Sequence, residues 1–481
     1  MASKKSTVEV IPSARRLINS LRDVGYDFKQ SVADLVDNSI AAGATYVAIQ
    51  MRFDGEESWL RIADNGTGMS GTTITEAMRF GSERNYEADE LGKFGLGLKT
   101  ASLSQCKRLT VASRVDASVR RIEVRQWDLE HISSTNRWEI IDVPADERRR
   151  ELVEPLQNER GTVILWEKMD RVLDYKVSWG ERAKSGFYRL AEELDLHLGM
   201  VFHRFLAGEA RRKKKLKIMI NDTAVEPWNP FAPLEKATLS LPAIQFDISG
   251  GERRGLVNYA PFILPTKEKF SSLKAFEKLA GPAKWNNQQG FYIYRADRMI
   301  QSGGWSYIRT PDEHTKLARI ALDFWPDLDS AFEVNVAKAR VNLPADLRKM
   351  LQPHVEQLVK QARKHYTPSN EPIMAGNPVP GSPPPPDGNI LHRASEAIGG
   401  NASAANNIPA TANPAAPGSA AYHSATSAAR TSQNDSHASE NGDVGRALEK
   451  AAAKAGEITA MKRIREVLQA DDPETASKIG W

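Results

Sequence analysis

The feature that most constrains this chain is an acidic residue at the end of an alternating apolar pattern. In LRIADNGTGMS, residues 60–70, the pattern predicts a strand in which Leu60, Ile62 and Asp64 share one face, because successive side chains of a strand alternate between its faces. That face carries the apolar positions and must lie against a core. A buried carboxylate is costly unless it finds hydrogen-bond donors, and the exocyclic amine of a purine is one candidate.

Two glycines follow this acid. Gly66 and Gly68 let the backbone turn sharply and let a flat ligand approach closely, because neither carries a side chain that would clash. Taken alone, the motif favours an ordinary turn after a strand, because glycine is common in turns.

A second glycine cluster, GKFGLGLKTASLSQ, covers residues 92–105. Gly92, Gly95 and Gly97 precede a segment with helical character that begins at Leu98. Backbone N–H groups at a helix N-terminus favour phosphate, and glycines allow it to approach. The segment is neither a Walker loop nor a dinucleotide fingerprint, since no Gly-Lys-Ser/Thr ends it and no strand leads into it. A different nucleotide pocket is indicated.

The segment DFKQSVADLVDNSIAAG, residues 27–43, predicts a helix that Asp27 caps and Gly43 ends. Asp34 and Asn38, four residues apart, share one side of it. The opposite side is apolar apart from one serine and consists of Val32, Leu35, Val36, Ser39 and Ile40. Without the glycine clusters, the acid and the amide would indicate only a plain polar helix face.

The following segments predict mainly strands. Residues 44–64 alternate on either side of a turn at Asp54-Gly55, which is typical of a hairpin, and KRLTVASR, VRRIEVRQW and GTVILWEK are further strand-like runs. We therefore expect an α+β fold, a two-layer sandwich with helices on one face of a mixed sheet.

Four blocks, in this order, resemble the GHKL superfamily with its Bergerat ATP-binding fold: DLVDNSIAAGA, IADNGTGM, GKFGLGLKTAS and RGTVILWEKMD, over about residues 30–170. The superfamily includes heat-shock chaperone ATPases, DNA gyrase B subunits, MutL and MORC proteins and histidine kinases. The resemblance implies that Asn38 holds a Mg²⁺ ion bridging the phosphates of ATP, that Asp64 binds the adenine amine and that Thr162 supports Asp64. It also implies that the nucleotide contacts Gly66, Gly68, Gly92, Gly95, Gly97, Leu98 and Lys99. For Lys99, which would neutralise a phosphate, the alternative is a solvated lysine in the first helical turn.

The resemblance also implies a lid and a general base. FGSERNYEADELGKFG, residues 80–95, is similar to the ATP lid of the family. The ATPase branches carry a glutamate four residues before the magnesium asparagine, and here that position is Asp34. Because aspartate is one methylene shorter, and about 1 Å of misplacement can cost ~10² in rate, binding follows more directly than fast hydrolysis. Asp37 is a possible substitute, but it points about 100° away from Asn38, so we assign the base to Asp34.

Residues 229–366, after a first domain over 1–228, resemble the transducer domain of MutL, MORC and chaperone relatives. GFYIYRADRMIQSGGW is similar to a transducer strand pair, and FEVNVAKARVNLP to the loop that sends a basic residue to the γ-phosphate. This makes Lys338 the candidate sensor and Arg340 the second choice, against an ordinary surface lysine. Histidine kinases lack such a domain, so the kinase branch is not favoured.

The rest of the chain is less specific. Residues 367–443, rich in Pro, Ala, Ser and Asn, predict a disordered linker, and 444–481 predict a short amphipathic helix that is either a partner element or a marginal solvated helix. The formal charge of +4 does not identify a nucleic-acid binder. The basic run RRKKKLK, residues 211–217, either contacts DNA phosphates or, as we favour, is a solvated hairpin tip. One buried cysteine, Cys106, and the lack of long apolar runs indicate a cytoplasmic protein without a membrane partner.

We therefore expect an ATP-binding protein and slow Mg²⁺-dependent ATPase that acts as an ATP-dependent homodimeric clamp. DNA is the first expected partner, by analogy with MORC and MutL. The alternatives are a chaperone-like ATPase acting on a protein client, and a non-hydrolysing ATP-sensing scaffold in which Asp34 is inert.

Overall fold

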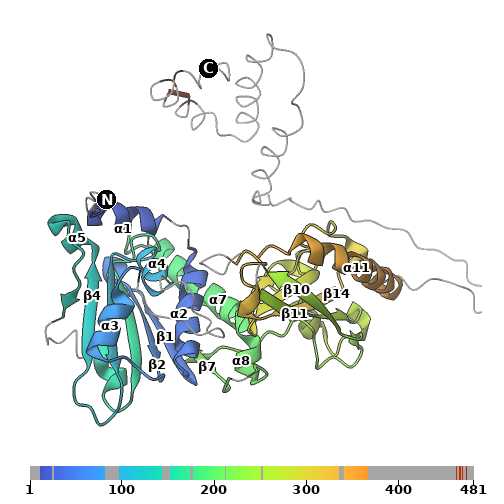
Figure 1. Cartoon of the computed structure of the whole chain (residues 1–481), viewed down its shortest axis with the longest axis horizontal. Helices are drawn as coiled ribbons and strands as arrows, with labels where there is room; N and C mark the ends of the chain where they lie inside the picture. The colour runs from blue at the N-terminus through green and yellow to red at the C-terminus, as the bar shows by residue number, and fades with distance from the viewer. Residues whose placement is uncertain are drawn as a thin grey trace, which may run out of the picture. The chain divides into compact units, whose positions relative to one another are not determined.

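The computed structural model describes residues 11–23, 26–81, 97–143, 152–173, 177–211, 213–250, 253–334 and 341–366, and residues 462, 465, 466, 469 and 473. The chain divides into two compact units, Met1–Gly376 and Asn377–Trp481. The first unit contains two β-sheets and their helices (Figure 1). The assignment of separate domains to 1–228 and 229–366 remains a prediction.

The first sheet has eight strands in the order β5-β4-β3-β6-β2-β1-β7-β8. Neighbouring strands are antiparallel except β1 and β7, which are parallel, so the sheet is mixed as predicted. The strands are β1 (Tyr46–Arg52), β2 (Trp59–Asp64), β3 (Arg108–Arg114), β4 (Glu123–Asp128), β5 (Ile141–Asp142), β6 (Gly161–Glu167), β7 (Lys217–Ile220) and β8 (Thr223–Ala224). β1 and β2 form the predicted hairpin.

Helices cover one face of this sheet and enclose the main core. The apolar side chains of β1 and β2, including Ile49 and Ile62, belong to one core that also contains residues from all of these helices. The helices are α1 (Ala14–Arg22), α2 (Phe28–Ala41), α3 (Gly71–Met78), α4 (Gly97–Leu103), α5 (Leu129–Thr135), α7 (Glu181–Val201) and α8 (His203–Ala207). On the opposite face, Leu152 and Leu156 cover Val163 and Leu165 of β6. The predicted α+β class is confirmed.

Helix α2 begins and ends as its sequence predicts. The Asp27 side chain accepts a hydrogen bond from the backbone N–H of Lys29 at 2.7 Å, which satisfies one of the free donors of the first turn. Gly43 follows the helix with a φ of +72°, a conformation that glycine adopts without strain. Helix α4 is shorter than the predicted 98–105 and covers Gly97–Leu103.

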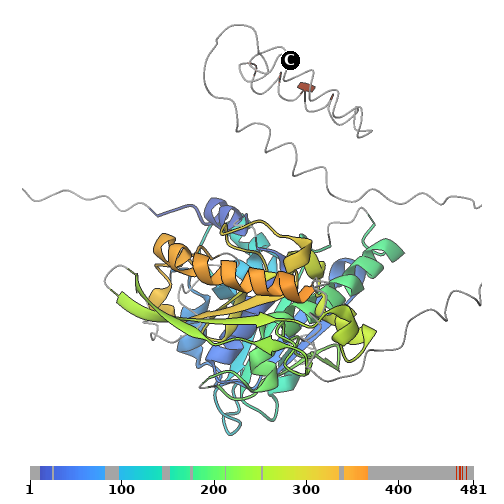
Figure 2. The same ribbon diagram turned by 90° about the vertical axis from the view of Figure 1, so that its right-hand side faces the viewer.

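The second sheet has the strand order β10-β11-β14-β12-β13, with β9 pairing β11. Its strands are β9 (Leu239–Ser240), β10 (Ile244–Gly250), β11 (Arg253–Ile263), β12 (Gly290–Arg295), β13 (Arg298–Ser302) and β14 (Ala318–Phe324). Helix α11 (Ala345–Tyr366) lies along one face (Figure 2), where Leu351 and Val355 pack against the strands. On the other face, Tyr292 and Tyr294 pack against Met200 at the end of α7. The smaller helices are α9 (Leu273–Leu279) and α10 (Lys284–Asn287).

The strand pair predicted in GFYIYRADRMIQSGGW is the hairpin of β12 and β13. Its turn residues, Ala296 and Asp297, have φ values of +47° and +67°. Asp297 accepts hydrogen bonds from Arg204 Nη1 of α8 at 3.0 Å and from the backbone N–H of Arg211 at 2.8 Å. The tip of the hairpin is therefore anchored to the segment that leads back into the first sheet.

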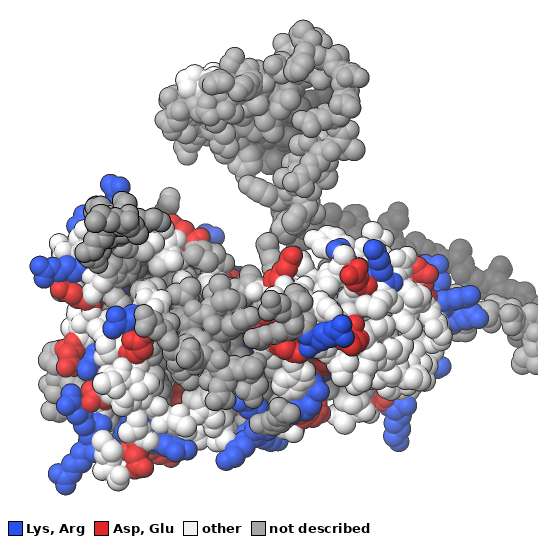
Figure 3. Space-filling view, in the orientation of Figure 1, with Lys and Arg blue, Asp and Glu red and all other residues white. Residues whose placement is uncertain are grey.

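The basic run at residues 211–217 is not a hairpin tip, because it connects helix α8 to strand β7. Its middle lysines, Lys213, Lys214 and Lys215, are solvent-exposed, as predicted. Basic and acidic side chains intermingle over the face of the molecule shown in Figure 3.

Cys106 is fully buried, as predicted, and its Sγ lies 3.2 Å from the carbonyl oxygen of Ser102. The predicted linker at 367–443 lies outside the described residues. So does the C-terminal helix, except for five described residues at 462, 465, 466, 469 and 473, which are helical. Among the described residues, no helix has the length and apolar character needed to cross a membrane.

Candidate nucleotide site

Asp64 lies at the end of β2 and faces the helices, as the alternation predicts. Its Oδ2 accepts a hydrogen bond from Ser39 Oγ of α2 at 2.9 Å, and its Oδ1 accepts one from the backbone N–H of Gly66 at 2.8 Å. These two donors hold the carboxylate in one orientation. An ionised carboxylate has about four acceptor positions, so Asp64 retains capacity for a further donor.

Burial raises the pKa of the Asp64 carboxyl above its ordinary value. The hydrogen bonds from Gly66 and Ser39 and the backbone of Thr162 act in the opposite direction, because each stabilises the charged form. The site therefore combines a partly desolvated acid with donors that favour its ionised state. Such an acid forms stronger hydrogen bonds than one in bulk water.

Thr162 lies beside Asp64 on the neighbouring strand. The two residues are directly paired between β2 and β6, and Thr162 also pairs Ser113 of β3. Thr162 Oγ1 lies 3.0 Å from Ser113 Oγ, and Ser113 Oγ accepts a hydrogen bond from the backbone N–H of Met69 at 2.8 Å. This pair of hydroxyls ties the sheet to the loop that follows Asp64.

The glycines of that loop are required by the packing of the chain against itself. A Cβ on Gly66 would lie 2.8 Å from Ala42 Cβ and 2.9 Å from the Asp64 carboxylate. Gly68 has a φ of +66°, and its Cβ would lie 2.0 Å from the carbonyl oxygen of Arg114. The sharp turn is thus confirmed for Gly68, whereas the close approach seen at both glycines is to protein atoms. Their contact with a ligand remains a prediction.

The polar side of α2 is largely buried. Asp34 is 2% exposed and Asp37 is fully buried, so this is not a plain solvated face. Both acids pair with Arg298 of β13, which lies in the second sheet. Asn38 is half-buried, and its side-chain amide makes no hydrogen bond with any residue that the structure describes. Its amide oxygen fits the oxygen ligands that Mg²⁺ prefers.

Lys99 is 2% exposed, so the alternative of a solvated lysine is wrong. Its Nζ donates a 3.0 Å hydrogen bond to the carbonyl oxygen of Ala77 and lies 6.0 Å from the centre of the Phe80 ring. Burial lowers the pKa of Lys99 to about 8, and nearby Glu76 raises it in part. A buried ammonium that is poorly solvated gains much from an anionic ligand.

The other residues of the second glycine cluster are only partly described. Gly97 begins α4, and no atom of the described residues lies within 4 Å of the position that its Cβ would take; Leu98 is partly buried against the core. Gly92, Gly95, Lys338 and Arg340 lie outside the described residues, as does the predicted lid beyond Gly81.

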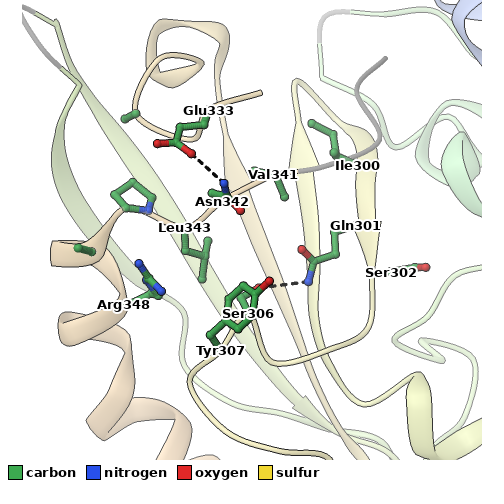
Figure 4. A pocket seen from close by; sticks show the side chains of 13 residues that line it. Ile300, Gln301, Ser302, Ser306, Tyr307, Glu333, Val341, Asn342, Leu343 and Arg348 are labelled. Atoms are coloured by element: carbon green, nitrogen blue, oxygen red, sulfur yellow. Dashed lines mark hydrogen bonds between the residues drawn. The ribbon is translucent and has the colours of Figure 1, made fainter. Parts of the chain in front are cut away.

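A cavity of about 810 Å³ lies elsewhere, beside the second sheet (Figure 4). Its lining residues come from β13, from the loop at Ser306 and Tyr307, from Ala331 and Glu333, from residues 341–344 and from the start of α11. Arg348 and Glu333 are its charged members. Asp64 does not line this cavity, and neither do Ser39, Gly66 and Thr162. The cavity is therefore separate from the candidate nucleotide site.

Four residues of the site were missed by sequence reasoning. Ser39 belongs to the apolar side of α2, where a hydroxyl among aliphatic residues was the available signal. Ser113 and Gly161 come from strands whose pairing partners the sequence does not reveal. Gly161 has a φ of +145°, and a Cβ there would lie 1.9 Å from the carbonyl oxygen of Asp64. Arg298 carried no local signal, because its partners on α2 lie 261 and 264 residues away.

Comparison with known families agrees with this geometry. Residues 26–162 match the family model described as histidine kinase-, DNA gyrase B- and HSP90-like ATPase. The matched range contains α2, the Asp64 loop, α4 and Thr162. No curated protein matches the chain. Among the described residues, no group of three or more His, Cys, Asp or Glu side chains is suited to hold a metal ion. Residues 26–162, which include strands of the first sheet and the helices beside Asp64, are therefore similar to the ATP-binding domains of the GHKL superfamily, as the sequence motifs indicate.

Proposed function

We propose that the chain binds ATP with Mg²⁺ in the pocket formed by α2, the Asp64 loop and α4, and hydrolyses it slowly. The observation that carries this proposal is the orientation of Asp64, whose carboxylate is held by Ser39 Oγ and the Gly66 N–H and retains acceptor capacity. An acid held in this way is suited to accept a hydrogen bond from the adenine amine. Thr162, beside it in the sheet, supports its position.

Asn38 would hold the magnesium ion. A single amide oxygen is a weak ligand set by itself, and Mg²⁺ ordinarily completes its octahedron with phosphate oxygens and water. The ion would neutralise phosphate charge when bound. Gly97, Leu98 and Lys99 lie at the start of α4, where Lys99 supplies a buried positive charge. Gly92 and Gly95 would continue this phosphate-binding segment.

Asp34 is the candidate general base, placed four residues before Asn38 on α2. Its side chain is one methylene shorter than that of glutamate, which favours slow turnover. The same feature also supports the second candidate function, a non-hydrolysing ATP sensor.

We further propose that ATP closes two protomers into a clamp, with Lys338 contacting the γ-phosphate. DNA is the partner that we favour, and the exposed lysines at 213–215 are suited to phosphate contacts. Lys338→Ala should lower ATP-driven dimerisation while leaving ADP affinity unchanged. Retention on duplex DNA that weakens as salt rises would support the DNA clamp, and its absence at all salt concentrations would favour a protein client.

The decisive experiment is calorimetric titration with ATP, with and without Mg²⁺, on wild type and Asp64→Asn. The amide replaces a carboxylate oxygen by an amino group that repels the adenine amine, so the variant should lose detectable binding. Asp142→Asn, on an exposed side chain of β5, is the matched control and should bind as wild type does. Equal affinity in wild type and Asp64→Asn would contradict the proposed pocket.

A further inference from the structure

Two acids of α2 meet one arginine from the second sheet. Arg298 Nε lies 2.8 Å from Asp37 Oδ2, and Arg298 Nη2 lies 3.5 Å from Asp34 Oδ1. Asp34 and Asp37 are three residues apart and therefore neighbours on the same helix face. The guanidinium thus reaches both carboxylates with different nitrogens, which a planar fork of donors permits.

All three side chains are buried, at 2% exposure for Asp34, 0% for Asp37 and 3% for Arg298. Two like charges in such a place are costly unless a cation stands between them. Arg298 supplies that cation from another sheet, so the position of Asp34 depends on a residue outside the nucleotide-binding domain.

The location of Arg298 is fixed by its hairpin. It is the first residue of β13, directly after the turn at Ala296 and Asp297, both of which have positive φ. Positive φ at residues other than glycine costs energy and persists where the surroundings hold it. Asp297 accepts hydrogen bonds from the Arg204 side chain and from the backbone N–H of Arg211, which hold this turn against the end of α8. Arg298, the next residue, pairs with Asp34 and Asp37 of α2.

We propose that Arg298 is a positioning residue for ATP hydrolysis, which orients Asp34 and makes turnover depend on how the second sheet docks on α2. This inference rests on the proposed function, in which Asp34 is the base. In this proposal Arg298 acts through Asp34 and not by contacting adenine or phosphate, so its effect should fall on kcat and spare ATP affinity. A misplacement of the base by about 1 Å is enough to slow turnover by ~10².

The test compares Arg298→Lys with Arg295→Lys. Arg295 is also a buried arginine, on β12. Its partner is Asp329, whose Oδ1 lies 2.6 Å from Arg295 Nε. Asp329 follows strand β14 of the same sheet, so this ion pair does not involve α2. Lysine keeps the charge in both variants and removes the fork. We expect Arg298→Lys to lower kcat at least about tenfold with the ATP dissociation constant within about threefold of wild type. Arg295→Lys should lose thermal stability and keep kcat within about twofold of wild type.

Equal kcat losses in the two variants, or an unchanged kcat in Arg298→Lys, would overturn the inference. So would a loss of ATP affinity as large as the loss of kcat. If Arg298→Lys does not fold, the double variant Arg298→Gln/Asp37→Asn removes one buried positive and one buried negative charge, keeps Asp34, and should show the same selective loss of kcat. Wild type is measured first. A wild type that binds no ATP contradicts the proposed pocket, and one that binds without turnover contradicts hydrolysis, whereas equal variants with an active wild type contradict this inference alone.

Discussion

Ser39 Oγ donates a 2.9 Å hydrogen bond to Asp64 Oδ2 and thereby joins helix α2 to the end of strand β2. Ser39 follows Asn38 directly, so the helix that presents the proposed magnesium ligand is fixed against the proposed adenine acid. The end of β2, which would bind adenine, and helix α2, which would bind the magnesium ion at the phosphates, are thus linked by a direct hydrogen bond.

Ser39→Ala should weaken ATP binding. It removes a donor that orients Asp64 and favours its charged form. Because a hydrogen bond to a charged group contributes ~1.5 to 3 kcal/mol, we expect about a tenfold or larger rise in the dissociation constant, measured by calorimetry. Ser20→Ala is the control, since Ser20 is exposed on α1 and its hydroxyl donates a hydrogen bond to the carbonyl oxygen of Arg16 in the same helix. An unchanged affinity in Ser39→Ala would contradict the orienting role.

Gly68→Ala should destabilise the first domain. Its φ of +66° costs an L-residue roughly 1 to 2 kcal/mol, and the new Cβ would lie 2.0 Å from the Arg114 carbonyl oxygen, which forces a backbone shift. Gly81→Ala separates the two effects, because Gly81 has a φ of +70° and, of the residues that the structure describes, none has an atom within 4 Å of its Cβ position. Thermal denaturation should show a larger loss for Gly68→Ala. Equal losses would mean that the loop relaxes away from Arg114.

Because of Lys99, the free energy of unfolding should rise with pH between about pH 8 and 10.5. Its pKa is about 8 in the folded protein and near 10.5 when unfolded, so the unfolded chain binds more protons between these values. In this window the free energy of unfolding should increase with pH in wild type and change less in Lys99→Met. Urea unfolding between neutral pH and pH ~10 measures this. Lys213→Met, at an exposed lysine, should follow wild type.

Lys99 should also take up a proton when ATP binds. If a phosphate lies beside Lys99, bound ATP raises its pKa, and the complex takes up a proton near pH 8 to 9. Calorimetry in two buffers with different ionisation enthalpies detects such uptake. Proton uptake that persists in Lys99→Met would assign it to another group.

Asp34→Asn should slow phosphate release by ~10² or more, because general-base catalysis contributes that much, and should leave ATP affinity within about threefold. Asp222→Asn, in the exposed turn between β7 and β8, should release phosphate at the wild-type rate. Background-level release in both wild type and Asp34→Asn would instead support the ATP-sensing scaffold.

Local patterns predicted the elements that build the pocket. Asp27 and Gly43 delimit α2 because capping and positive φ depend on neighbouring residues only. The direction of Asp64 followed from strand alternation, which a single strand is enough to determine. The hairpin of β1 and β2 followed from the turn that joins its strands, and the strand pair of β12 and β13 was implied by the resemblance to a transducer domain.

Burial of charge was not predictable in the same way. Lys99 was equally compatible with solvent, and the run at 211–217 was mistaken for a hairpin tip because a basic segment does not reveal which elements it joins. The turn of Gly68 was predicted, but not its closeness to Arg114, since that depends on how β3 and the loop pack.

The order of the motif blocks in the sequence indicated an ATP-binding domain by resemblance, and local periodicity predicted helix α2, the hairpin of β1 and β2 and the acid that faces the core. Only the tertiary structure decided that Ser39 orients Asp64 and that Arg298 reaches Asp34 and Asp37 from a second sheet. The physical reason is that a buried ion pair between residues far apart in the chain forms only when two separately folded surfaces dock, and no local pattern encodes that docking.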